Sequence, residues 1–169
     1  MRRSLACYWR HSGWASDPVA RAFDPAAFDR IERVVSEGEA GHRGEIRFAL
    51  EQSLDWGQLR RGVSARERAL QVFGEHRVWD TEYNTGVLIY LLTADHAVEI
   101  IADRHAHQHL PAGLWPQLCR MIVDACRDGR PVDGVIVAIE RLNQAFIDAL
   151  PVLPGADNRN ELDNRPVRL

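Results

Sequence analysis

Two short apolar runs separated by a tight turn constrain the fold of this 169-residue chain more than any other feature. The runs are Val87 to Thr93 and Ala97 to Ala102, and the turn is Thr93-Ala94-Asp95-His96. Two strand-length apolar segments joined by so short a turn are typical of an antiparallel hairpin. The chain is therefore expected to build a sheet around residues 87–102.

A further strand and a helix precede the hairpin. Polar and apolar residues alternate from Gly44 to Glu51, which is the pattern of a half-buried strand. Ser64 followed by Glu67 matches a capping box, and apolar residues at helical spacing come after it. Because a strand–helix–strand unit crosses over between parallel strands, we expect the strand at 44–51 to pair in parallel with the first hairpin strand. The sheet is then mixed.

The remainder of the ordered chain is predicted to be helical. Asp24-Pro25 indicates a helix start, and apolar residues at helical spacing continue to about Gly38. Two more apolar stripes run from Leu118 to Gly129 and from Val135 to Leu150. Helices covering both faces of the sheet give the predicted fold class, an α/β protein with a three-layer α/β/α sandwich around a mixed central sheet.

The length fits one domain, with an N-terminal extension at 1–23, the domain itself at 24–151 and a tail at 152–169 that lies on the surface or frays. A net charge of −3, with arginines scattered beside carboxylates, argues against nucleic-acid binding. The first residues lack the apolar core of a signal peptide, and no apolar stretch is long enough to span a membrane. These features predict a cytoplasmic protein.

The entry to the hairpin carries a recognisable pattern. Thr81, Asn84 and Gly86-Val87-Leu88 are followed by a second strand that ends at Asp103. The pattern resembles that of the TPM domain family, which is named for a thylakoid lumen phosphatase, a photosystem II repair protein and a receptor modulator. The likeness runs from about Asp24 to the C-terminus and is greatest to the soluble bacterial subgroup without a membrane anchor. His105 departs from it, because the family usually has glycine there.

The resemblance implies cation binding more directly than catalysis. Some members of the family are reported to bind calcium or another divalent ion, and some are reported as weak phosphatases. The sequence has none of the common enzyme motifs, namely GxSxG, the Walker loop, GxGxxG and HExxH. No catalytic residue is assigned, and any activity is expected to be that of a weak phosphomonoesterase.

The hairpin register gathers polar side chains at one end of the predicted sheet. With the turn centred on Ala94-Asp95, Asn84 lies opposite His105, beside the start of the first strand. Oxygen donors on loops suit calcium or magnesium, and a histidine beside them could pass protons. The same residues are also ordinary turn and capping residues. The candidate metal-site residues are Asp80, Glu82, Asn84, Asp103 and His105.

Three alternate histidines follow the hairpin, at His105, His107 and His109. Such a group could bind zinc or nickel with one more ligand. The segment follows a strand and precedes Pro111, so we predict a solvated loop, and no second histidine or cysteine cluster is placed by the sequence to complete a site.

Two hypotheses for function therefore remain open. The first is a TPM domain that binds a divalent cation at the acidic end of the sheet, with weak phosphatase activity. The second is a non-catalytic module that binds another protein. It predicts an exposed apolar patch around Trp9, Trp14 and the C-terminal tail.

Overall fold

The computed structural model describes residues 17–153, 155 and 158–169, so Trp9 and Trp14 lie outside the described residues. In the described part of the chain, helices are interspersed with the first three strands, and three helices and a short strand follow. The elements are α2 (Pro18–Ala22), α3 (Pro25–Glu39), β1 (Glu45–Glu51), α4 (Trp56–Arg61), α5 (Ala65–Glu75), β2 (Gly86–Leu92), β3 (Ala97–Ala102), α6 (Arg104–His109), α7 (Leu114–Arg127), α8 (Pro131–Ala149) and β4 (Val167–Arg168).

The sheet is mixed, as predicted, with strand order β3-β2-β1-β4. β1 pairs in parallel with β2, with Glu45 opposite Gly86, and β2 pairs antiparallel with β3, with Leu92 opposite Ala97. The helical crossover and the hairpin that were read from the sequence are both confirmed.

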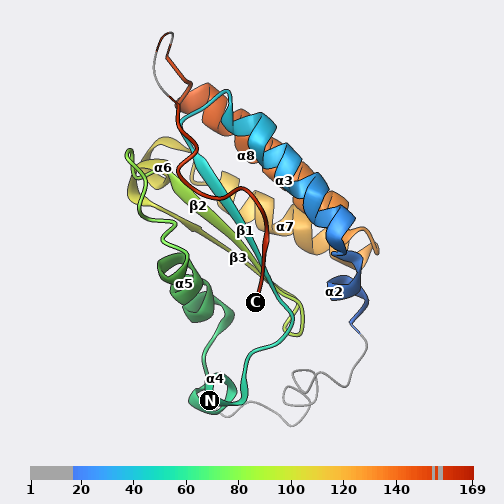
Figure 1. Cartoon of the computed structure of the whole chain (residues 1–169). Coiled ribbons are helices and arrows are strands. Elements are labelled where there is room, and N and C mark those ends of the chain that lie inside the picture. The colour runs from blue at the N-terminus through green and yellow to red at the C-terminus, as the bar shows by residue number, and fades with distance from the viewer. Residues whose placement is uncertain (1–16, 154, 156–157) are drawn as a thin grey trace.

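Helices cover both faces of the sheet unequally (Figure 1). α3, α7 and α8 lie on one face over the larger hydrophobic cluster, which includes Phe48, Ile89 and Phe146. α5 covers the other face over a smaller cluster that includes Leu88 and Tyr90. The three-layer α/β/α sandwich is therefore confirmed. Among the described residues, no helix combines the length and the apolar character needed to cross a membrane.

Side-chain caps fix the starts of the two helices that were predicted most sharply. The Asp24 carboxylate accepts a hydrogen bond from the Ala27 backbone N–H at 2.8 Å, and Pro25 opens α3. Ser64 and Glu67 form the reciprocal capping box that opens α5. Such caps satisfy backbone donors that have no partner within the helix, which is why the sequence signal is reliable.

The segment after β3 is not the loop that was predicted, because residues 104–109 form α6. Asp103 caps this short helix, since its Oδ1 accepts from the Arg104 backbone N–H. Ala106 and Leu110, four residues apart, are both buried. This apolar pair has the helical spacing that buries one side of a helix turn. In the sequence, the histidines between these two apolar residues obscure the helical spacing.

The C-terminal tail, which was predicted to lie on the surface or fray, ends in the short strand β4. Val167 pairs with Ala49 in parallel, and the Leu169 backbone N–H donates to the Leu50 carbonyl at 2.9 Å. Leu162 is buried in the smaller cluster. The tail thus covers the outer edge of β1, where backbone groups would otherwise lack partners.

Candidate functional site

The candidate site lies where β1 and β2 begin and β3 ends. The Asp103 backbone N–H donates to the Gly86 carbonyl at 2.8 Å, and the His105 backbone N–H donates to the Asn84 carbonyl at 3.1 Å. The hairpin pairing therefore continues past the regular strands in the predicted register. Asn84, Asp103 and His105 are brought together as the sequence suggested.

Asn84 has a left-handed backbone, with φ at 54°. Asparagine tolerates this conformation better than most residues do. The turn directs the Asn84 carbonyl at the start of α6, where it accepts from the backbone N–H groups of His105 and Ala106. The local backbone thus fixes the distance between the entry to β2 and the end of β3.

Asp103 has one satisfied and one unsatisfied carboxylate oxygen. Oδ1 accepts from the Arg104 backbone N–H at 2.6 Å. Oδ2 is buried and has no hydrogen-bond partner among the residues that the structure describes. A buried polar atom without a partner carries a free-energy cost, and it is commonly satisfied by water or an ion.

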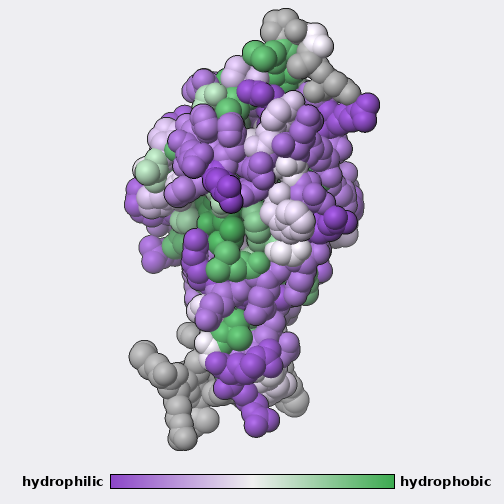
Figure 2. Space-filling model, turned by 90° about the vertical axis from the view of Figure 1, so that its left-hand side faces the viewer, coloured by the Kyte–Doolittle hydropathy of each residue, from purple (hydrophilic) through white to green (hydrophobic). Residues whose placement is uncertain are grey.

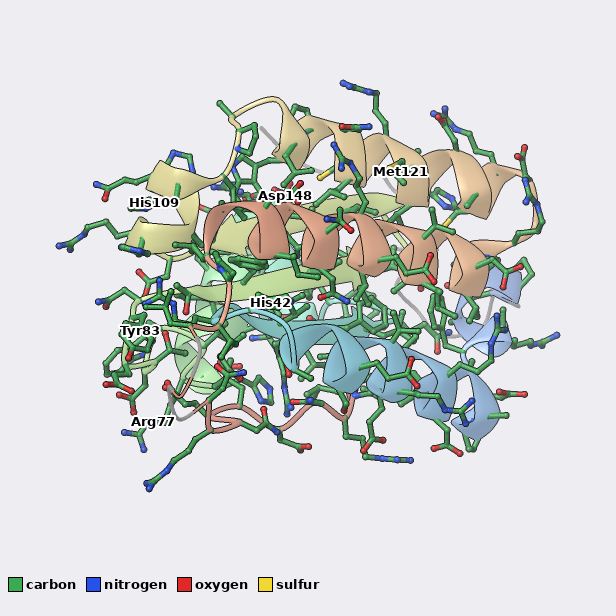
Figure 3. The ribbon with its side chains drawn as sticks, turned by 90° about the horizontal axis from the view of Figure 1, so that it is seen from above. His42, Arg77, Tyr83, His109, Met121 and Asp148 are labelled. Carbon is green, nitrogen blue, oxygen red and sulfur yellow. The ribbon has the colours of Figure 1, made fainter. Side chains whose placement is uncertain are left out.

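His105 lies beside Asp103 and stacks on His109, with ring centroids 3.9 Å apart. Burial, the neighbouring His109 and Arg43 lower the pKa of His105 below its ordinary value of 6.5, so its ring is neutral at pH 7. His107 lies on another side of α6, with its ring 6.3 Å from that of Trp115. Figure 3 shows His109, Tyr83 and Arg77 at this same end of the molecule, with His42 further inside.

Asp80 and Glu82 lie in the loop before Asn84. The Asp80 carboxylate is 2.7 Å from the Arg77 guanidinium. The Glu82 backbone N–H donates to the Glu161 carboxylate at 2.7 Å. Within the described residues, no three histidine, cysteine, aspartate or glutamate side chains converge as a ready metal site. The structure therefore brings together three of the five predicted residues and leaves two in the adjoining loop.

Two buried glutamates at the same end were not singled out as site residues by the sequence. Glu39 ends α3, and its Oε1 accepts from the Ile46 backbone N–H at 2.7 Å. Glu45 starts β1, and its Oε2 accepts from the Leu162 backbone N–H at 3.1 Å. Burial, reinforced by the Glu45 charge, raises the pKa of Glu39 to about 8, and burial raises that of Glu45 to about 7.

The buried Glu39 carboxyl predicts a pH-dependent stability. Because its pKa is about 8 in the folded chain and 4.5 ordinarily, the folded state holds the extra proton between these values. The free energy of unfolding should then fall as pH rises from about 5 to about 8, by up to about 1.4 kcal/mol per pH unit for this group. Urea unfolding at several pH values, with chelator present, measures this slope. Glu39→Gln should flatten it, and an unchanged slope would contradict the assignment.

Comparison with known proteins relates the chain to one family and one fold. The family model described as "TPM domain" matches residues 18–145, beginning inside the predicted N-terminal extension. Among solved structures, the NMR structure of BA42 protein from the psychrophilic bacterium Bizionia argentinensis is similar, with a TM-score of 0.75 and 23% identity. That similarity covers 86% of this chain and 94% of that chain, and at this identity it concerns the fold alone. No curated protein matches the chain.

Proposed function

This chain belongs to the TPM domain family, and from that premise we propose that it binds a divalent cation, calcium or magnesium, beside Asp103 and Asn84. The observation that carries the proposal is the Oδ2 atom of Asp103, which is buried without a hydrogen-bond partner in the described part of the chain. A hard cation is the natural partner of such an oxygen, because calcium and magnesium take oxygen ligands almost exclusively.

The other predicted residues would contribute to the site in different ways. Asn84 is exposed at the entry to β2, where its backbone carbonyl accepts from His105 and Ala106, and its side-chain amide offers a further oxygen donor. Asp80 and Glu82 are exposed in the preceding loop, where their carboxylates add negative charge near the site. Asp80 would have to leave Arg77 to act as a direct ligand. His105 is a poor ligand for these hard cations, which favours a role in proton transfer.

The reaction that fits such a site is hydrolysis of a phosphomonoester, at the low rate of a weak phosphatase. A bound cation would hold a phosphate group and polarise a water molecule. His105 would accept the proton from that water, since its lowered pKa keeps the imidazole neutral at pH 7. His105 also stacks on His109, which holds its ring in place at the site.

Isothermal titration calorimetry of the metal-stripped chain tests the cation site. Calcium or magnesium should give a binding isotherm with wild type, and Asp103→Asn should weaken it at least tenfold because the anionic oxygen is lost. Asp124→Asn is the matched control, since Asp124 is an exposed aspartate on α7 paired with Arg127. Equal binding by wild type and Asp103→Asn would exclude Asp103 as a ligand.

An interaction module is the second candidate, favoured by where exposed apolar side chains lie. Four of the eight exposed large hydrophobic side chains among the described residues come from the segment around α4 and α5, namely Trp56, Leu70, Trp79 and Tyr83, which are between 39% and 61% exposed. Figure 2 shows hydrophobic side chains near the middle of the face that carries α5, surrounded by hydrophilic ones. A protein partner would cover this face. The cytoplasmic setting for either function stays a prediction.

A further inference from the structure

Arg43 combines burial with the lack of a charge partner, which sets it apart from the other described arginines. Three of these arginines are wholly or partly buried, namely Arg43, Arg47 and Arg68, and the rest are exposed. The Arg47 guanidinium lies 3.5 Å from the Asp163 carboxylate, and that of Arg68 lies 2.9 Å from Glu51. Arg43 forms no ion pair within the described part of the chain. A half-buried guanidinium without a carboxylate is costly, so an anion from outside the chain would stabilise it.

The backbone places Arg43 at the same end of the sheet as the candidate site. Its carbonyl accepts from the Thr85 hydroxyl at 2.6 Å, and Thr85 directly follows Asn84. β1 starts two residues after Arg43, and the first residue of β1 lies opposite Gly86. Extending this register by two residues sets Arg43 opposite Asn84, which is itself paired with His105. The three residues therefore lie at one level across neighbouring segments of the sheet.

The Arg43 side chain has a hydrogen-bond donor without an acceptor. The central carbon of its guanidinium lies 5.0 Å from the centroid of the Tyr83 ring. This ring holds the cation by its face but supplies no oxygen in the guanidinium plane. Nε is the one guanidinium nitrogen of Arg43 that is buried without a partner among the described residues. Because the residue is only partly buried, its terminal nitrogens remain open to an incoming ligand.

Two unsatisfied groups of opposite kind thus lie at this end of the sheet. Oδ2 of Asp103 lacks a donor and Nε of Arg43 lacks an acceptor within the described part of the chain. The Arg43 charge also acts electrostatically on the nearby His105 ring. A cation alone would satisfy Asp103 and leave Arg43 without a partner. An anion beside that cation would satisfy both, and phosphate is favoured because its oxygens match the planar fork of a guanidinium.

We propose that the Arg43 guanidinium binds the phosphate group of the substrate at the candidate site. This inference rests on the proposed function, since it names the side chain that receives the phosphate of a phosphomonoester. The terminal nitrogens of Arg43 donate to phosphate oxygens, and the Tyr83 ring keeps the guanidinium from turning away. A guanidinium and a divalent cation acting on one phosphate favour a monoester, which carries about two negative charges at neutral pH, over a singly charged diester.

NMR of the uniformly ¹⁵N-labelled full chain, titrated with inorganic phosphate, tests the proposal. The reporter is the Nε–H signal of Arg43, which is assigned by its absence from the spectrum of Arg43→Gln. With magnesium present, this signal should shift in wild type, and calorimetry should show phosphate binding about tenfold weaker in Arg43→Gln. Arg43→Lys, which keeps the charge but not the fork, should recover part of the affinity. Arg120→Gln, at an exposed arginine of α7, is the matched control and should bind like wild type.

Asp103→Asn separates this inference from the proposed cation site. Without metal, this substitution removes a negative charge that opposes an anion, so the variant should bind phosphate at least as well as metal-free wild type. Adding Arg43→Gln to Asp103→Asn should abolish that binding. Phosphate binding that depends on Arg43 but is not strengthened by magnesium would refute the cation site and support the role of Arg43.

Two results would overturn the assignment of Arg43. The first is an Nε–H signal that stays unmoved at millimolar phosphate, with and without magnesium. The second is equal phosphate affinity in wild type and Arg43→Gln. Either result would refute the role of Arg43 even if magnesium binding at Asp103 is confirmed. Equal affinity for inorganic phosphate and for dimethyl phosphate would overturn the preference for a monoester.

Discussion

Arg68→Ala is expected to lower the free energy of unfolding by about 3–5 kcal/mol, because it leaves a buried carboxylate without its cation. Arg68 is 9% exposed, and its Nε donates to the Glu51 carboxylate at 2.9 Å. Glu51 is 6% exposed and also accepts from the Tyr90 hydroxyl at 2.7 Å. Burial and the Glu51 charge raise the pKa of Tyr90, which keeps its hydroxyl protonated as a donor. Three polar groups thus satisfy one another beneath α5.

Equilibrium urea unfolding measures this effect, with Glu75→Ala as the matched control. Glu75 also pairs with Arg68, at 3.2 Å, but its side chain is 56% exposed. Exposed ion pairs contribute little, so the control should lose less than about 1 kcal/mol. Similar losses in the two variants would mean that the Glu51 charge is reached by water and that the network is not a buried one.

Gly86→Ala is expected to destabilise the fold by about 3 kcal/mol, at the upper end of what one added methyl group costs in a packed interior. A Cβ at this position would lie 1.8 Å from the Val78 carbonyl oxygen. The obstacle is backbone of a buried residue, so it cannot move aside as a flexible side chain would. Gly86 also lies between Glu45 and Asp103 in the sheet, so the clash would disturb the candidate site.

Gly74→Ala is the matched control for this substitution. Gly74 lies in α5, and an added Cβ there meets nothing within 4 Å. Because glycine is less favourable than alanine in a helix, this variant should gain up to about 1 kcal/mol. Thermal unfolding of both variants beside wild type gives the comparison. A Gly86→Ala protein as stable as wild type would contradict the close packing of Val78 on β2.

Local patterns were sufficient to predict three of the four strands of the described sheet. The turn at residues 93–96 and the apolar runs beside it fix the hairpin register, and that register extends correctly to the pairing of Asn84 with His105. The capping box at Ser64 marks the helix start because it satisfies backbone donors within the same segment. Each of these signals depends on residues that are close in sequence, so a single chain can reveal them.

Features that depend on distant segments could not be predicted. The sequence predicted only a tail that lies on the surface or frays, because the two strand residues, Val167 and Arg168, leave no periodic pattern. The burial of Glu39 and Glu45 follows from that same tail folding back, with Leu162 donating to Glu45. In isolation these glutamates look like ordinary solvated residues.

The candidate site was predicted only in part. The backbone register alone brings Asn84, Asp103 and His105 together, so the sequence could suggest them. The position of Asp80 depends on which side chain it meets, and Arg77 lies 2.7 Å away. A pairing of this kind inside a loop cannot be inferred from hydrophobic periodicity.

The most direct test of the cation site is a crystal structure of the full chain grown with manganese, analysed by anomalous scattering. Manganese occupies oxygen-ligand sites like those of magnesium and calcium, and its anomalous signal identifies its position directly. We expect a peak beside Oδ2 of Asp103, within coordinating distance of the carboxylate. A map with no peak at Asp103, while peaks elsewhere prove that manganese is bound, would contradict the proposed site.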